Sequence, residues 1–358
     1  MQDAFVAAAE RWPRTGVPRN PGAWIVAAAR NRAIDRIRRE QTLRRKTELL
    51  ARAETLPTDE EAVIADERLE LIFACCHPAL AADAQVGLTL SLVGGLTTPE
   101  IARAFLVPEA TLAQRLVRAK RKIRDAGIPL RVPPEHLLPE RLRTVLAAIY
   151  LVFNAGYGPP VRQELCAEAI RLALLLATLM PDEAEVHGLH ALVLLQDARR
   201  DARVQDGAIV LLDDQDRSRW DWDEIEQGRA ALDRALALRM PGPYQLQAAV
   251  AALHFEDETD WEQIALLYSR LLDFTPSPVV ELNRAVAVAL AHDLEDGLLL
   301  VERIEGLEDY YLFHAARADL LRRLERVDEA EGAYSRALAL APTELERGFL
   351  RGRLAALR

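Results

Sequence analysis

Cysteine, lysine and long apolar segments are all scarce in this 358-residue chain. Three cysteines are too few for a disulfide framework. Two of them, Cys75 and Cys76, precede His77 but lack the second ligand pair of a structural zinc site. No apolar run approaches the roughly 20 uncharged residues that cross a bilayer. These absences predict buried thiols, no bound metal, and a reducing, cytoplasmic setting.

Catalytic motifs and alternating β-branched segments are also missing. Without a nucleophile–base set, a phosphate-binding loop or a metal quartet, the sequence predicts no catalytic residue, no cofactor and no enzymatic activity. Ala, Leu, Arg and Glu dominate, so we expect an all-α fold. The exception is Ala208–Leu212, which reads as a short strand or an extended loop. The acidic segment 213–223 lacks EF-hand spacing and also contains two arginines. This composition favours structural pairing of the acids over Ca²⁺ binding.

Charge is distributed unevenly along the chain, whose formal net charge is −10. Residues 1–131 contain 21 basic and 16 acidic side chains, and the remainder contains 24 basic and 39 acidic ones. A front part that binds nucleic acid and an acidic rear part are the natural interpretation. If the rear part weakens DNA binding electrostatically, deletion from about Pro133 should strengthen that binding at low salt.

The stretch from Leu96 to Arg124 predicts a helix-turn-helix. Thr97 and Glu100 have capping-box spacing, and Pro108 ends the first helix and can open the second. In the second helix one set of apolar side chains recurs at three- and four-residue steps and should face inward: Leu112, Leu116, Ala119 and Ile123. Its cationic residues are left to the other faces, as in a helix that lies in the major groove. A helical hairpin with a solvated basic face is the alternative.

A second basic block lies in the predicted helix from Asn20 to Arg39. Trp24, Ile34 and Ile37 have core-like spacing, and five arginines surround them. Two basic helices about 70 residues apart suggest two contacts on one duplex. Packing is the favoured role for Trp24, and stacking of an unpaired base on its ring is the alternative.

Repeated phrases mark the rear part. Tyr268–Pro276 and Tyr334–Pro342 are nearly identical and begin 66 residues apart, and Leu232–Pro241 is a looser copy. Small residues such as Ala318 and Ala330 fall where paired helices must approach closely. The pattern predicts tetratricopeptide (TPR)-like helix pairs, with generic helical packing as the alternative.

Together these segments resemble the extracytoplasmic-function (ECF) sigma factors. The run from Asp3 to Arg39, which ends in the phrase Ala-Arg-Asn-x-Ala-Ile-Asp-x-Ile-Arg-Arg, resembles their region 2, and Leu96–Arg124 resembles region 4. The rear part, Phe73–Pro78 and Tyr150–Asn154 resemble a subgroup with a TPR-like extension, in which we expect an acid where this chain has Ala155. The resemblance implies three domains: 1–55 as partial region 2, 56–131 as region 4, and 132–358 as a TPR-like domain. It also implies that part of region 2 would precede Met1.

The resemblance implies partners and contact residues: RNA polymerase core, promoter DNA at the −10 and −35 elements, and a protein partner for the TPR-like domain. Polymerase contacts would fall on Gln2, Asp3 and Phe5. Contacts to the −10 element would fall on Trp24, Arg30, Asn31, Arg38 and Arg39. At the −35 element, Thr111, Gln114 and Arg115 would read bases, and Arg118, Lys120, Arg121 and Lys122 would bind phosphates. The alternatives are a helix-turn-helix regulator that acts without polymerase and a TPR adaptor with a degenerate DNA-binding part.

Overall fold

The computed structural model describes residues 67–105, 107–129, 131–133, 138–158, 161–205 and 207–357. The chain divides into the units Met1–Val63 and Ile64–Arg358, and every described residue belongs to the second. Two sets of predicted contacts therefore lie outside the described residues. They are the polymerase set Gln2, Asp3 and Phe5 and the −10 set Trp24, Arg30, Asn31, Arg38 and Arg39.

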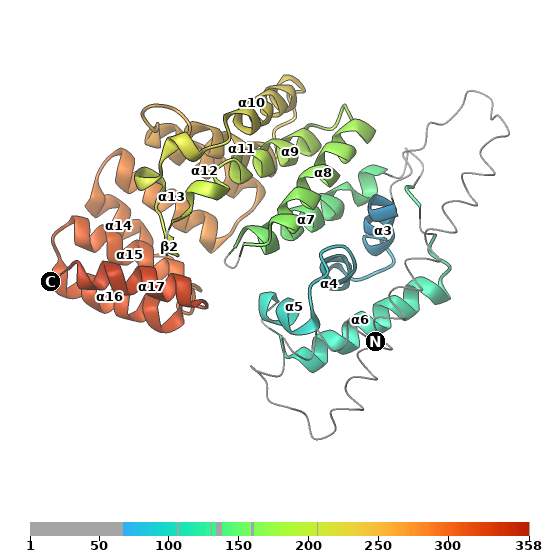
Figure 1. The fold of residues 1–358 in the computed structure, drawn as a ribbon, viewed down its shortest axis with the longest axis horizontal. Helices are drawn as coiled ribbons and strands as arrows, with labels where there is room; N and C mark the ends of the chain where they lie inside the picture. Colours follow the sequence, from blue (N-terminus) through green and yellow to red (C-terminus); the bar gives the residue numbers. More distant parts are fainter. Residues whose placement is uncertain are drawn as a thin grey trace, which may run out of the picture. The chain divides into compact units, whose positions relative to one another are not determined.

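Helices dominate the described residues, which confirms the all-α prediction. In the ranges that the structure describes, no helix is both long enough and apolar enough to span a bilayer. The helices run in chain order as α3 (Glu67–Cys75), α4 (Ala82–Leu92), α5 (Thr98–Ala104), α6 (Glu109–Asp125), α7 (Leu138–Tyr157), α8 (Gln163–Leu179), α9 (Ala184–Asp197), α10 (Trp222–Ala237), α11 (Pro243–Leu253), α12 (Trp261–Phe274), α13 (Pro278–Ala291), α14 (Leu294–Glu302), α15 (Tyr311–Arg323), α16 (Val327–Leu340) and α17 (Glu344–Ala355) (Figure 1).

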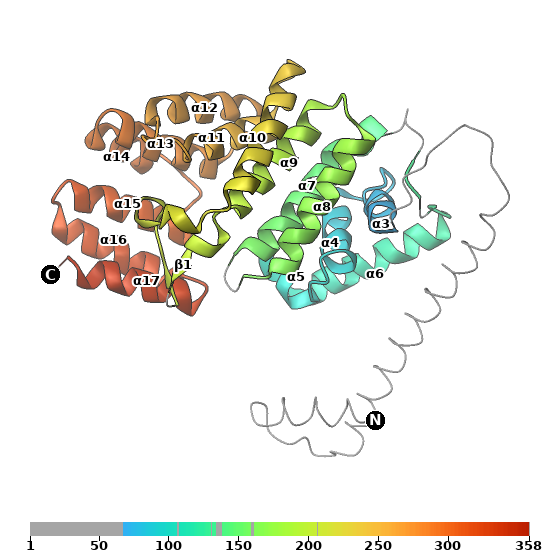
Figure 2. The same cartoon turned by 45° about the horizontal axis from the view of Figure 1, so that its top comes forward.

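A small hairpin interrupts the helices between α9 and α10. β1 (Val204–Gln205) pairs antiparallel with β2 (Ala208–Ile209), and β2 contacts α17 (Figure 2). The sequence predicted a strand or extended loop over Ala208–Leu212, and both occur there, because the paired strand stops at Ile209. Short 3₁₀ turns flank the hairpin: η2 (Arg200–Ala202), η3 (Leu212–Asp214) and η4 (Arg217–Arg219).

One apolar core joins the helix-turn-helix to the helices that follow it. α4 contacts both α6 and α7, and α3 also contacts α7. The same buried cluster contains Leu69 of α3, Leu116 of α6, Val145 of α7 and Val193 of α9. Because one core extends from α3 to α9, the helix-turn-helix shares its stability with α7 and α8.

The repeated phrases occupy equivalent places in three helix pairs. Each phrase forms the end of a helix, namely α10, α12 or α16, and a proline follows that end. In each case the next helix begins two residues after this proline, at Pro243, Pro278 and Glu344. A proline cannot continue a helix, because it has no backbone N–H and clashes with the preceding turn. Helices joined by such short connections pack side by side, as α15, α16 and α17 do in both views (Figures 1 and 2).

Small residues set the closest approach within these pairs, as the sequence predicted. Ala285, Ala318 and Ala330 are fully buried or nearly so. Gly297 on α14 faces Ala289 on α13 so closely that an added Cβ would lie 2.7 Å from the Ala289 Cα. That distance is shorter than real Cβ contacts, so only glycine fits at this crossing without a shift of one helix.

Gly297→Ala should therefore destabilise the protein, although alanine is the better helix former. We expect a loss of about 1–3 kcal/mol from overpacking, measured by urea unfolding. Gly332→Ala on α16 is the matched control, since no atom lies within 4 Å of its added Cβ. It should gain about 0.5–1 kcal/mol from a less flexible unfolded chain. A gain from both substitutions would contradict the close packing of α13 and α14.

Candidate nucleic-acid interface

The second helix of the helix-turn-helix, α6, has one apolar and one basic side. Leu112, Leu116 and Ala119 are at most 5% exposed, and Ile123 is half-buried, so the predicted inward face is confirmed. Most of the predicted DNA contacts are exposed on the remaining surface of the helix, with Arg115 half-buried: Thr111, Gln114, Arg118, Lys120, Arg121 and Lys122. The apolar side fixes the helix against α4 and α5, and the cationic side remains accessible.

The turn between α5 and α6 forms as the local sequence predicts. The Thr97 backbone N–H donates to the Glu100 carboxylate over 2.7 Å, which is one half of a capping box. α5 ends at Ala104, and Pro108 occupies the N-cap position of α6. Proline suits this place because the first turn of a helix needs no N–H donor from it. Thr97 and Glu100 therefore fix where α5 begins, and Pro108 fixes where the basic helix α6 begins.

Two basic side chains on one flank of α6 reach the α3–α4 segment. The Arg115 guanidinium lies 3.3 Å from the Asp83 carboxylate on α4. Lys122 donates to the Ala79 backbone carbonyl. Arg118 instead stays on the same helix and donates to Gln114 over 3.2 Å. The Arg115–Asp83 pair is 39% and 66% exposed, so it is worth only about 0–1 kcal/mol and a nucleic acid can replace it.

An apolar residue that the sequence analysis missed lies among these cations. Val117 is 66% exposed and shares a helix face with Gln114 and Arg121, three and four residues away. A valine side chain that stays exposed to water contributes no burial free energy to folding. The sequence does contain a signal for this position, because Val117 is apolar but does not follow the three- and four-residue spacing of the inward-facing residues.

Polar contacts from α7 and α8 hold the helix-turn-helix in addition to the shared core. Arg162 lies 3.6 Å from Glu100 and donates to the Gly94 carbonyl over 3.4 Å. Arg141 on α7 donates to the Phe73 carbonyl at 3.2 Å. All three contacts bridge 60 residues or more of sequence, which no local pattern could reveal.

The cysteines are buried thiols, as predicted. Cys75 and Cys76 are at most 1% exposed and Cys166 is 2% exposed. Burial raises the pKa of Cys75 to about 11 and that of Cys76 to about 12, although a hydrogen bond with Thr89 opposes the shift. A thiol that stays protonated at neutral pH is a poor nucleophile and a poor metal ligand.

Two of the acids at 213–223 have structural roles in the chain. Asp216 caps η4 and Asp221 caps α10 by accepting backbone N–H bonds. Trp220 is buried against Phe255, with ring centroids 5.1 Å apart, and anchors this segment on α11 and the turn after it. Among the described residues, no group of three or more His, Cys, Asp or Glu side chains has metal-binding geometry.

One arginine near this segment faces three carboxylates. Arg200 lies 3.0 Å from Glu224 and 3.5 Å from Asp221, and it also pairs with Asp197. Burial raises the pKa of Glu224 to about 7, and the nearby charge of Asp197 adds to the shift while Arg200 opposes it. A single guanidinium therefore does not compensate all three acids at neutral pH.

Glu224→Gln should stabilise the protein, and more so at pH 8 than at pH 5. A carboxyl whose pKa is raised by folding costs stability that grows as pH rises from its ordinary pKa of 4.5 to about 7. We expect the glutamine to recover roughly 2 kcal/mol at pH 8 and little at pH 5, measured by urea unfolding. Glu226→Gln, an exposed acid on the same helix, is the control. Equal gains at both pH values would show that Glu224 does not titrate in this range.

These features define a class: an all-α protein whose helix-turn-helix exposes a basic recognition helix. Residues 70–123, which span most of α3 through most of α6, match the family model of sigma-70 region 4, and residues 1–42 match that of sigma-70 region 2. Residues 141–236 match a family of unknown function (DUF6596). An uncharacterized protein of Rhizobium meliloti (strain 1021) is 45% identical over 372 residues, which cover 99% of this chain and 88% of that protein.

The chain belongs to the sigma-70 family, and its regions 2 and 4 with the third domain are those of an ECF-type sigma factor. The resemblance found in the sequence is thereby confirmed. Members of this family direct RNA polymerase to promoters, so the basic side of α6 is the candidate interface with promoter DNA.

Proposed function

We propose that this chain selects promoters for RNA polymerase, with α6 in the major groove of the −35 element. The exposed basic side of α6, opposite its buried apolar side, is the observation that carries the proposal. Thr111, Gln114 and Arg115 lie in its first half and contact base edges. The four cations Arg118, Lys120, Arg121 and Lys122 bind phosphates, which fix the position of the helix on the duplex.

Val117 adds an apolar contact to this interface. Since it lies on the face of Gln114 and Arg121, it can reach the groove together with them. The C5-methyl group of thymine is the apolar feature of the major groove. Val117 therefore favours a thymine at the position that it faces.

Region 2 supplies the second contact in this proposal. The segment from Asn20 to Arg39 meets the −10 element through Arg30, Asn31, Arg38, Arg39 and the ring of Trp24. Gln2, Asp3 and Phe5 bind the polymerase. Two DNA contacts and a polymerase contact on one polypeptide supply binding energy and base selection, while polymerase carries out the chemistry.

We also propose that the helix pairs of residues 132–358 form a TPR-like domain that regulates the factor by binding a protein partner. The repeat spacing, the small residues at the helix crossings and the proline after each repeated phrase support this assignment. A net charge of −15 over this part favours a basic partner.

In vitro transcription with core polymerase tests the proposed function. Core polymerase with this chain should initiate at defined sites, and core polymerase alone should not. Variants with Lys120, Arg121 and Lys122 changed to Ala should still join the core enzyme but lose initiation. DNA binding without association with polymerase would favour the regulator alternative. A chain that neither binds DNA nor associates with polymerase would favour the TPR adaptor alternative.

A further inference from the structure

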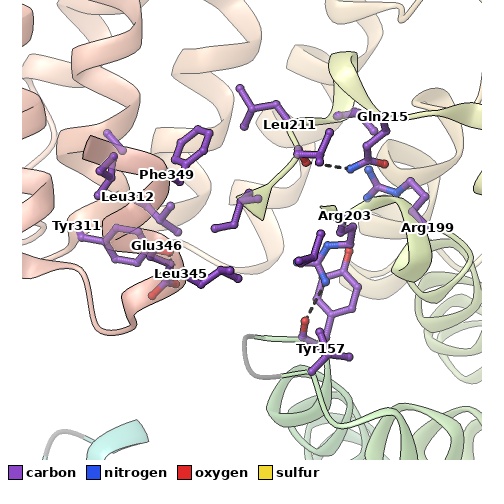
Figure 3. Close-up of a pocket in the computed structure, with 17 residues that line it drawn as sticks. Tyr157, Arg199, Arg203, Leu211, Gln215, Tyr311, Leu312, Leu345, Glu346 and Phe349 are labelled. Atoms are coloured by element: carbon purple, nitrogen blue, oxygen red, sulfur yellow. Dashed lines mark hydrogen bonds between the residues drawn. The ribbon is translucent and has the colours of Figure 1, made fainter. Parts of the chain in front are cut away.

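A cavity of about 430 Å³ lies beside the β-hairpin and has no role in the proposed contacts with DNA or polymerase. The end of α7, the hairpin with the segment that follows it, α15 and α17 form its walls. Figure 3 shows the lining side chains converging from these elements. The volume falls within the range of about 300–1,000 Å³ that is typical of small-molecule sites.

One side of this cavity is apolar. Leu312 on α15, Leu345 and Phe349 on α17, and Leu211 after the hairpin line it. Leu312 is 43% exposed and Leu211 is 38% exposed, so large apolar surfaces face open space here. An apolar body placed between them would cover surface that folding leaves uncovered.

The other side carries two arginines. The Arg203 guanidinium lies 3.5 Å from the centre of the Tyr157 ring and donates to the Tyr157 carbonyl over 2.8 Å, which fixes its position. Arg199 lies next to it, and the Arg199 Nε is buried without a hydrogen-bond partner. Within the described part of the chain, no ion pair joins either guanidinium to a carboxylate, and the Arg199 guanidinium lies 5.9 Å from the centre of the Phe255 ring.

A half-buried guanidinium without a carboxylate partner is costly. Burial lowers the pKa of Arg199 and the nearby charge of Arg203 lowers it further, while Tyr157 opposes the shift. Two adjacent guanidiniums without a carboxylate are also unusual in a part of the chain with 39 acidic and 24 basic residues. A bound anion would pair both arginines and satisfy the open Nε donor.

The carboxylate in the cavity wall is already satisfied. Glu346 on α17 accepts a hydrogen bond from the Tyr311 hydroxyl over 2.6 Å and another from the Thr343 N–H over 3.0 Å. It lies on the α17 side, across the cavity from the two arginines (Figure 3). The cavity therefore has a cationic end and an apolar end, with its acid engaged in the wall.

We propose that this cavity binds a small organic acid with an apolar body. Its carboxylate pairs with Arg199 and Arg203, and its apolar body lies against Leu211, Leu312 and Phe349. Binding would join the α7 end, the hairpin and α17, which are distant in sequence. Through such a site, a small organic acid could regulate a promoter-selecting protein by binding to it directly. Binding of the acid itself requires neither DNA nor polymerase.

Three probes test the proposal on the full chain by isothermal titration calorimetry and thermal shift. Decanoate has both the carboxylate and the apolar body, decanol only the body, and acetate only the charge. We expect decanoate to bind and raise the melting temperature, and to bind at least tenfold more tightly than decanol or acetate. Failure of decanoate to bind, or equal binding by decanol or acetate, would overturn the proposal.

Variants locate the binding. Arg199→Gln and Arg203→Gln should each weaken decanoate binding at least tenfold, and Phe349→Ala should weaken it severalfold. Arg219→Gln, at an exposed arginine outside the cavity, should leave it unchanged. Decanoate binding that survives both arginine substitutions would place the acid elsewhere and refute this site. The comparison of the three probes on the unaltered chain decides the question even if a variant does not fold.

Discussion

Val145→Asp should abolish sequence-specific DNA binding, although Val145 lies outside the helix-turn-helix. This side chain is fully buried on α7, in the cluster that also contains Leu116 of α6. An unpaired carboxylate in that core costs more than about 4 kcal/mol, a large part of the stability of most domains. We expect the loss of cooperative unfolding in urea, together with proteolysis of the α3–α6 segment.

Leu151→Asp is the matched control, because it places the same charge on an exposed position of the same helix. It should change stability by less than about 0.5 kcal/mol and leave DNA binding intact. If Val145→Asp left the DNA-binding segment folded, that segment would be stable without α7. The shared core would then contribute little to the stability of that segment.

The shared core also changes the interpretation of a deletion from Pro133. The charge distribution predicts that removal of the acidic rear strengthens DNA binding at low salt. That deletion would also remove α7 and α8, which contribute Val145, Val152 and Leu172 to the core around the DNA-binding helices. Neutralising exposed acids of the rear part, such as Asp257 and Asp309, would test the electrostatic effect without this loss.

Arg115→Ala should weaken binding to the selected promoter by about 1–3 kcal/mol, roughly 5- to 150-fold, and relax selectivity at one base pair. The reason is the position of Arg115 in the first half of α6, where a bidentate contact to guanine is possible. Lys120→Ala should instead weaken binding to all sequences alike and reduce the salt dependence by about one phosphate contact. Fluorescence anisotropy on promoter and random duplexes at several salt concentrations measures both effects.

Asp83→Asn separates a DNA contact of Arg115 from a structural role. It breaks the same 3.3 Å ion pair from the other side and leaves the guanidinium free. If Arg115 reads a base, this variant should bind promoter DNA as well as the unaltered chain or slightly better. An equal loss for both variants would assign Arg115 to holding α6 on α4. Equal losses of Arg115→Ala on promoter and random DNA would assign it to phosphate.

Much of the DNA-binding segment could be predicted from the sequence because local rules fix it. Pro108 defines the start of α6, and the spacing of Leu112, Leu116 and Ala119 defines its buried side. The end of each repeated helix could be predicted for the same reason, since a proline follows it. The partner of Arg115 could not, because Asp83 lies 32 residues away and no periodicity links the two.

The sequence by itself determined the all-α fold, the apolar face of α6, the ends of the repeated helices, the buried thiols and the family. These follow from hydrophobic period, proline positions and residue chemistry, which act over a few residues. Only the tertiary structure decided that α7 and α8 complete the core of the DNA-binding segment. It alone brought Arg199 and Arg203 to the cavity that Phe349 lines, 146 residues or more along the chain. Contacts of that separation depend on how whole helices pack, and the packing of many side chains fixes them together.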